Sequence, residues 1–213
     1  MDTQPFVVTI SHQLGSGGAY LGEKLAARLN IPFLDRAILQ QVARQLDLAE
    51  ADLARREERL SSFWQNFART AILTDPAMSL AAQKYEPSDT DLFSLECSTI
   101  QAIAEKGSAV ILGRCGWYVL RYHTRHVSLL VTASQPARVK RLNELFGLSE
   151  AEALERIKTN DQQRGDYMHA FTKRNWLDAR YYDLCVNTSA VGWDCTVELA
   201  EKCVRNKLQL PLS

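Results

Sequence analysis

The 213-residue sequence has 25 basic and 25 acidic side chains, so its formal net charge is zero. Hydrophobic residues make up 46% of the chain and charged residues 23%, a composition that excludes a largely disordered protein. The balanced charge argues against extended nucleic acid as a partner, because proteins that bind it are usually basic. The chain has neither the roughly 18-residue apolar run of a membrane helix nor an export signal, so we expect a cytoplasmic protein.

Five cysteines are spread along the chain, and none forms a Cys-x-x-Cys pair. This pattern predicts reduced thiols and no zinc site. Cys185 lies inside an apolar run, and we expect it to be buried. Cys115 follows a Gly-Arg pair, which leaves open a place near a site, although burial is the commoner state of a free cysteine.

The chain begins with a pattern typical of a strand, a glycine loop and a helix. Residues 6–11 are β-branched or aromatic and predict a buried strand. The loop Gly15–Gly18 follows, and after it a stripe of leucines indicates an amphipathic helix. Asn30 and Pro32 are the expected end signals of that helix.

The rest of the chain alternates between strand and helix patterns. Further strands are predicted at 31–34, 108–112, 126–132 and 182–187, and helices at 37–75, 91–106, 136–147, from 149 onward and 197–207. Ser149 and Glu152 have the spacing of a capping box at one helix start. Five short apolar strands separated by helices predict an α/β fold, with a five-stranded parallel sheet covered by helices on both faces.

The loops that follow these strands carry most of the polar motifs. They comprise residues 11–18, 35–36, 113–114, 132–134 and 187–189. Parallel sheets bind ligands at the carboxyl ends of their strands. We therefore expect these loops to form one site.

The loop Gly15–Gly18 predicts a phosphate site, because such a turn before a helix directs several backbone N–H groups at one point. The alternative is a tight turn that needs only the positive φ of glycine. The loop is not a standard P-loop, since Gly18 and Ala19 stand where Lys and Ser or Thr are required. Under the phosphate interpretation, we expect Gly17→Val to abolish ATP binding with little loss of fold.

Arginines near the strand ends offer positive charge in place of the missing lysine. Arg114 follows the third predicted strand, and Arg138 and Arg141 are three residues apart on one helix face. Arg156 and Arg164, eight apart, are predicted to share a face of the next helix. For each of them the alternative is an ordinary solvated surface arginine.

Several of these motifs, in this order, resemble the cytidylate kinase-like family of bacteria. They include the Ser-His-Gln-Leu-Gly-Ser-Gly-Gly loop, then Ile31–Arg36, Val110–Arg114, the block Asp161-x-x-Arg164-x-x-Tyr167 and the stretch from Trp176 to Ser189. The resemblance spans almost the whole chain, except for the helical region at about 45–95. One departure is His12, which stands where the family usually has arginine.

The resemblance implies one P-loop kinase-like domain of the nucleoside monophosphate kinase type. It has a helical acceptor-side insertion at about 45–95 and lid-like helices at about 145–175. The implied reaction moves the γ-phosphoryl group of ATP, with Mg²⁺, to a nucleoside monophosphate, with CMP or dCMP as the first expectation. Small nucleotides are the implied partners, and the sequence does not indicate an oligomeric state.

The resemblance also implies roles for individual residues. It implies that Ser11, His12, Gly15, Ser16, Gly17, Gly18 and Thr188 bind the donor nucleotide and that Asp35, Arg36 and Arg114 bind the acceptor. The implied catalytic residues are the lid arginines Arg138, Arg141 and Arg164, with Asp161, which would orient a lid arginine or contact the acceptor. Asp35 has an alternative role as a helix N-cap. Two other functions stay open: a nucleotide-binding protein without transfer activity, favoured by the missing lysine, and a kinase of another small acceptor.

Overall fold

The computed structural model describes residues 4–35, 39 and 90–211. The expected helix at 37–75, most of the helical insertion and Arg36 lie outside them.

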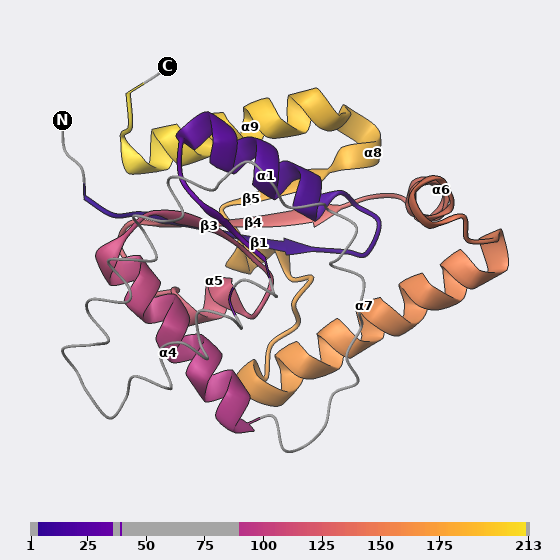
Figure 1. Cartoon of the computed structure of the whole chain (residues 1–213), viewed down its shortest axis with the longest axis horizontal. Coiled ribbons are helices and arrows are strands. Elements are labelled where there is room, and N and C mark those ends of the chain that lie inside the picture. The colour runs from indigo at the N-terminus through magenta and orange to yellow at the C-terminus, as the bar shows by residue number, and fades with distance from the viewer. Residues whose placement is uncertain (1–3, 36–38, 40–89, 212–213) are drawn as a thin grey trace.

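A five-stranded parallel sheet forms the centre of the molecule (Figure 1). Its strands are β1 (Val7–His12), β2 (Phe33–Leu34), β3 (Ala109–Leu112), β4 (His126–Thr132) and β5 (Leu184–Asn187), in the order β2-β3-β1-β4-β5. β1 is the central strand, and Val8 lies opposite both Val110 of β3 and Val127 of β4. The predicted parallel α/β fold is confirmed.

Helices cover both faces of this sheet. One face carries α1 (Gly18–Leu29), α8 (Thr188–Val191) and α9 (Trp193–Leu208), and the other carries α4 (Thr90–Lys106) and α5 (Gly116–Val119) (Figure 1). Beyond the carboxyl end of β4, α6 (Gln135–Phe146) and α7 (Glu150–Thr172) form a hairpin, and a 3₁₀ turn spans Ala179–Tyr181. The sequence did not predict α5, α8 or the 3₁₀ turn, because elements of three or four residues have no measurable periodicity.

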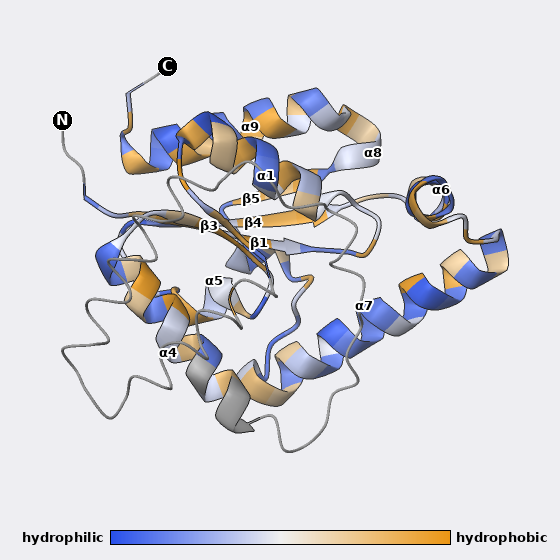
Figure 2. Cartoon of the chain, viewed as in Figure 1, coloured by the Kyte–Doolittle hydropathy of each residue, from blue (hydrophilic) through white to orange (hydrophobic). Residues whose placement is uncertain are grey.

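The core lies on both sides of the sheet because the strands are apolar on both faces (Figure 2). Ile10 of β1 packs with Leu21 and Leu25 of α1 in one cluster, while Val7 packs with Ile103 of α4 in another. A strand buried on both faces needs an unbroken apolar run rather than alternation. This is the pattern from which the strands were predicted.

The helix boundaries follow their sequence signals. Asn30 ends α1 in a left-handed conformation, with φ of +53°. At the start of α7 the Glu152 N–H donates to the Ser149 hydroxyl oxygen, and the Ser149 N–H donates to the Glu152 carboxylate. The predicted capping box is therefore confirmed. α9 begins at Trp193, four residues earlier than expected.

The cysteines of the described part of the chain form no disulfide, and one of them differs from expectation. Cys115 is buried, but Cys185 is exposed. The prediction for Cys185 is wrong because β5 lies at the edge of the sheet, where β4 is its one neighbouring strand. None of the helices in the described segments is long and apolar enough to cross a membrane.

A buried histidine at the start of β4 predicts that the folded state becomes less stable at acid pH. His126 contacts the Thr9 hydroxyl (2.7 Å), and burial, with the charge of Lys207, lowers its pKa to about 4. An unfolded chain binds this proton near pH 6.5, so the free energy of unfolding should fall between pH 6.5 and 4. The lowered pKa corresponds to a loss of about 3 kcal/mol at most.

We expect His126→Gln to flatten this pH dependence in urea unfolding curves. Burial also lowers the pKa of His12, which makes the free energy of unfolding fall at low pH in the wild type and in His126→Gln alike. The difference in pH dependence between the two proteins therefore reports on His126. The exposed His169 gives the control variant His169→Gln. Equal pH slopes for the wild type and His126→Gln would show that His126 is not the titrating group.

Candidate active site

The predicted site loops meet at the carboxyl edge of the sheet. The loop after β1 lies between the ends of β3 and β4, because the Gly113 N–H donates to the Ile10 carbonyl and the Gln13 N–H to the Val131 carbonyl. On the other side of β4, the Ser134 N–H donates to the Ser189 hydroxyl (3.0 Å). The expected convergence of loops is therefore present, although these contacts do not establish what they bind.

Two hydroxyl side chains hold the glycine loop in shape. Ser16 is fully buried, and its hydroxyl lies within hydrogen-bond distance of the carbonyls of Gln13 (2.8 Å) and Val131 (3.0 Å). Thr188 donates from its hydroxyl to the Ser16 carbonyl (2.9 Å). Both were predicted to contact the donor nucleotide, but their hydroxyl donors are used inside the protein. Their contribution is to fix the loop.

The loop keeps free backbone donors at the start of α1. Gly18 is the first residue of this helix, and the amides of Gly17, Gly18 and Ala19 have no hydrogen-bond partner in the described segments. The first N–H groups of a helix have no intrahelical acceptor, and the helix dipole makes this end partly positive. An anion placed here would meet several donors at once.

The three loop glycines that face other parts of the protein are required by packing. A Cβ at Gly15 would lie 2.9 Å from the Arg138 carbonyl oxygen. A Cβ at Gly17 would overlap the Trp193 ring, and one at Gly18 would overlap the His12 side chain. Gly15 and Gly17 also have positive φ, at +79° and +85°. The turn interpretation is therefore confirmed for this loop, and the phosphate interpretation stays a prediction.

This packing corrects the expectation that Gly17→Val spares the fold. We expect Gly17→Val to lower the free energy of unfolding, because valine would be strained at positive φ and would collide with Trp193. Gly147 also has positive φ but open space around it, so Gly147→Val is the matched control. In urea unfolding, the free energy of unfolding of Gly17→Val should be about 1–3 kcal/mol lower than that of Gly147→Val. Equal free energies of unfolding would contradict the collision with Trp193.

A buried ion pair joins the loop to the α6–α7 hairpin. Arg138, which is 5% exposed, donates from Nε to the Leu14 carbonyl (2.6 Å) and from Nη2 to the Asp161 carboxylate (2.6 Å). The other Asp161 oxygen accepts from the Leu14 N–H (3.3 Å). Arg138 and Asp161, predicted as catalytic lid residues, thus clamp the backbone of the loop.

Arg164 of α7 is engaged with the loop in a similar way. Its Nη1 donates to the His12 carbonyl, and its Nη2 lies 3.0 Å from the His12 Nε2. Since an arginine can only donate, His12 accepts at Nε2 and carries its proton on Nδ1. Burial and the charges of Arg164 and Arg138 hold the pKa of His12 well below its usual value, so the ring is neutral.

The neutral ring gives a physical reason for the departure at residue 12. An arginine at this position would bring a second guanidinium against Arg164 in a buried place, where repulsion between like charges is strong. Burial already lowers the pKa of Arg164 to about 10. Histidine instead provides an acceptor for Arg164.

Arg141 differs from these arginines because its N–H groups have no acceptor among the described residues. Its guanidinium carbon lies 4.2 Å from the centroid of the Trp193 ring, in a cation–π contact. It makes no hydrogen bond or ion pair with any described residue, and burial lowers its pKa. Because the Trp193 ring also contacts Gly17, this unpaired cation is linked to the glycine loop through a single side chain.

Arg114 sits at the end of β3 in strained backbone. Gly113, Arg114 and Cys115 have φ of +76°, +55° and +54°, which is costly for the two residues with side chains. Arg114 Nη1 lies 3.3 Å from the Glu96 carboxylate, and the Tyr167 hydroxyl donates to the same carboxylate (3.2 Å). Arg114 Nη2 is buried with no hydrogen-bond partner among the described residues. An anionic ligand would satisfy it.

The positions of the other predicted site residues neither support nor contradict a role in binding a nucleotide. Ser11 is buried in β1. Asp35 follows β2, and its carbonyl accepts from the Leu39 N–H (3.0 Å), as an N-cap residue would. Arg156 is exposed, whereas Arg164 is half-buried. Among the described residues, no group of three or more His, Cys, Asp or Glu could hold a metal ion.

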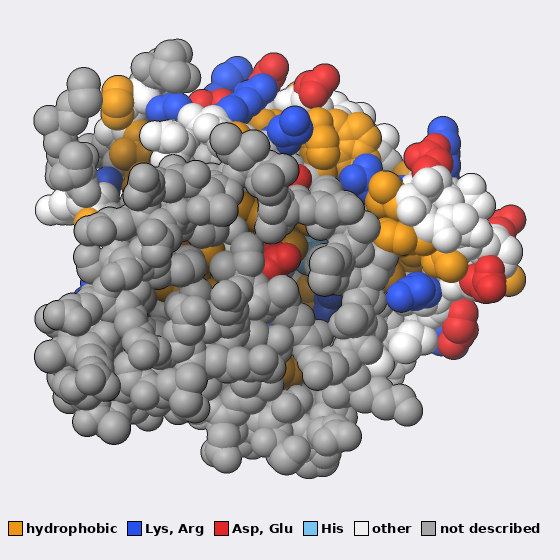
Figure 3. Space-filling view, in the orientation of Figure 1, with side chains coloured by type: hydrophobic (Ala, Val, Ile, Leu, Met, Phe, Trp, Pro, Cys, Tyr) orange, Lys and Arg blue, Asp and Glu red, His pale blue; other side chains and the backbone are white. Residues whose placement is uncertain are grey.

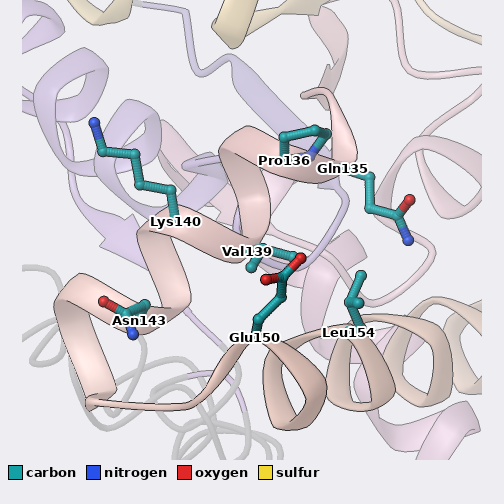
Figure 4. A pocket seen from close by; sticks show the side chains of 7 residues that line it. All are labelled: Gln135, Pro136, Val139, Lys140, Asn143, Glu150 and Leu154. Carbon is teal, nitrogen blue, oxygen red and sulfur yellow. The ribbon is translucent and has the colours of Figure 1, made fainter.

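A cavity of about 400 Å³ lies between α6 and α7 (Figure 4). Its lining residues are Gln135, Pro136, Val139, Lys140, Asn143, Glu150 and Leu154, none of which is a predicted site residue. Acidic and basic side chains are mixed over this end of the molecule and over α1 and α9 (Figure 3). This mixture agrees with the zero net charge and gives the cavity no distinct ligand preference.

Sequence reasoning missed two residues that contact the site. Glu96 sits on the apolar face of α4, four residues before Ile100, and a carboxylate in that stripe was a usable signal. Trp193 follows Gly192 shortly after the last predicted loop, but nothing in its local sequence places it on a glycine 176 positions earlier.

Comparisons with known proteins give a consistent assignment. Residues 7–190 match the family described as cytidylate kinase-like. A cytidylate kinase of Ignicoccus hospitalis is 23% identical over 197 residues, which cover 92% of this chain and 97% of that protein. The crystal structure of an uncharacterized protein from Eubacterium ventriosum shares the fold, with a TM-score of 0.68 and 23% sequence identity. The match covers 97% of this chain and 99% of that protein.

Another relative matches over a smaller part of its length. A uronate isomerase of Corynebacterium glutamicum is 31% identical over 113 residues, which cover 52% of this chain and 21% of the isomerase. The chain thus spans about a fifth of that enzyme. The match says nothing about an isomerase activity here.

Proposed function

Because the chain belongs to the cytidylate kinase-like family, whose members are phosphotransferases of the nucleotide or small-molecule kinase type, we propose that it transfers the γ-phosphoryl group of ATP to a nucleoside monophosphate. CMP or dCMP is the proposed acceptor. The observation that carries this proposal is that Trp193 contacts Gly17 and also the Arg141 guanidinium, while neither that guanidinium nor the amides of residues 17–19 have a hydrogen-bond partner among the described residues.

These groups fit a polyphosphate chain. The amides at the start of α1 supply hydrogen bonds to phosphate oxygens, and the helix dipole adds positive charge. Arg141 supplies the fixed cation that a standard P-loop takes from its lysine. Arg138 and Arg164 cannot fill this role without releasing Leu14, Asp161 and His12.

Phosphoryl transfer needs positioning and neutralisation of charge more than covalent help from the protein. Mg²⁺ bound with ATP would supply further charge neutralisation at the phosphates, and such ions are commonly held largely by phosphate oxygens and water. The protein itself has two roles in this reaction: it fixes the conformation of the glycine loop, and it leaves the N–H donors of Arg141 free to bind phosphate. Ser16, Thr188, Arg138 and the Arg164–His12 pair serve the first role.

Arg114 is the proposed anchor of the acceptor phosphate. Its buried Nη2 has no partner among the described residues, and Glu96 restricts the rest of the guanidinium. An aromatic cluster that includes Trp117, Tyr167 and Tyr181 adjoins it, with Trp117 and Tyr181 stacked at 4.7 Å. Trp117 is buried, whereas Tyr167 is half-buried and its ring centroid lies 5.8 Å from the Arg114 guanidinium carbon, so Tyr167 is the proposed aromatic contact for the nucleobase.

A panel of acceptors tests the proposed substrate. A coupled assay with ATP and Mg²⁺ should give the highest kcat/KM with CMP or dCMP among the common nucleoside monophosphates. A higher kcat/KM with another nucleoside monophosphate would show that the acceptor carries a different base from the proposed cytosine. Activity confined to an acceptor that is not a nucleotide would overturn the proposed acceptor class.

One observation favours a second candidate, a nucleotide-binding protein without transfer activity. Two of the three arginines expected in a catalytic lid are held by groups of the loop itself. A protein that only binds ATP would need the amides of the loop and no free catalytic cation. The free guanidinium of Arg141 is the reason for preferring the kinase.

A further inference from the structure

The Trp193 side chain covers the glycine loop. Trp193 is the first residue of α9, and its ring fills the space that a side chain at residue 17 would need. Tyr20, the third residue of α1, meets this ring edge-on, with centroids 5.4 Å apart and planes inclined by 70°. The ring is therefore fixed against the loop and against the helix that follows it.

The same ring carries the Arg141 guanidinium, 4.2 Å from its centroid. Arg141 projects from α6, whereas Trp193 starts α9, 52 residues later in the chain. Arginine side chains have several rotatable bonds, so an unpaired one would spread over many positions. Contact with a fixed aromatic face restricts the guanidinium to the neighbourhood of the loop.

A π face holds an arginine differently from a carboxylate. A carboxylate would accept the N–H donors of Arg141 and neutralise its charge, as Asp161 does for Arg138. An aromatic ring accepts the cation through its face and leaves the five N–H donors free for an anion. Among the described residues, Arg141 indeed makes no hydrogen bond.

We propose that Trp193 is a positioning residue for phosphoryl transfer, which holds Arg141 beside the glycine loop with its donors free. This inference rests on the proposed kinase function. Trp193 itself would not touch the transferring phosphoryl group. Its effect on the reaction would pass through Arg141, and that dependence distinguishes positioning from a general role in the fold.

The test compares Trp193→Leu and Trp193→Phe, each alone and combined with Arg141→Ala, in steady-state assays with ATP and the best acceptor. Trp193→Leu keeps an apolar cover over Gly17 but lacks a π face, and we expect kcat to fall about tenfold with a small change in the KM for ATP. Trp193→Phe should restore most of kcat. In the Arg141→Ala background, Trp193→Leu should cause no further loss.

Lys140→Ala provides a matched background, because Lys140 neighbours Arg141 on α6 and has no contact with Trp193. In that background the full effect of Trp193→Leu should remain. An unchanged kcat in Trp193→Leu, or an equal loss with and without Arg141, would overturn the positioning role while leaving the kinase function intact. A folded wild type that transfers phosphoryl to no acceptor would overturn the kinase function, and the role of Trp193 with it.

Discussion

Arg141→Ala should lower kcat about a hundredfold while the Kd for ATP changes far less. In the proposed transfer reaction, the negative charge that Arg141 would meet is largest in the transition state, and the loop contains no lysine that could replace it. Arg141 is the one arginine of the α6–α7 hairpin predicted as catalytic that makes no hydrogen bond or ion pair among the described residues. Steady-state kinetics and equilibrium ATP binding, measured on the same preparations, give the two quantities.

Lys140→Ala is the control for this prediction. Lys140 is the adjacent residue of α6, its side chain is 78% exposed, and it pairs loosely with Glu144 (3.8 Å). Lys140→Ala removes the same charge from the same helix as Arg141→Ala but leaves the Trp193 contact in place. We therefore expect kcat to stay within about twofold of the wild type. Equal losses in the two variants would mean that net charge on the helix matters, and not the placement of Arg141.

Arg114→Lys should raise the KM for the acceptor about tenfold or more. A lysine ammonium cannot form the forked contact of a guanidinium, and it would be shorter in a place where Arg114 already leaves one nitrogen unsatisfied. The strained backbone at Arg114 and Cys115 supports a functional role, since such strain is commonly found at binding sites. Acceptor titrations at saturating ATP measure the effect.

Arg121→Lys is the matched change for Arg114. Arg121 is an exposed arginine just after α5 that stacks on Tyr118 at 3.9 Å. Its replacement should leave the acceptor KM unchanged, because Arg121 contacts Tyr118 and Tyr122 and makes no recorded contact with Arg114 or Glu96. If Arg114→Lys also has the wild-type KM, Arg114 serves only to hold Glu96 and Tyr167 in place.

Much of the fold could be predicted because its signals are local. The apolar runs of β1 and β4, the Asn30 end of α1 and the Ser149 capping box all depend on residues close in sequence. The exposure of Cys185 could not be predicted, because an apolar run does not show which strand lies at a sheet edge. α9 began early for a similar reason, since its first turn packs on α1 rather than following a periodic pattern.

For the candidate site, the sequence indicated the loops but not the state of each arginine. The rule that loops meet at the carboxyl edge placed Gly15–Gly18 and Arg114 in one region. Arg138 and Arg141 looked equivalent, three residues apart on one helix. Their difference depends on distant partners, the Leu14 carbonyl for one and the Trp193 ring for the other, which no local pattern reveals.

Transfer of label from [γ-³²P]ATP tests the central claim most directly. Wild-type protein with Mg²⁺ and a panel of nucleoside monophosphates should move the label into a nucleoside diphosphate, most rapidly with CMP or dCMP, and Arg141→Ala should slow this transfer about a hundredfold. Binding of ATP without label in any acceptor would contradict the kinase function. It would instead assign this site to a nucleotide-binding protein without transfer activity.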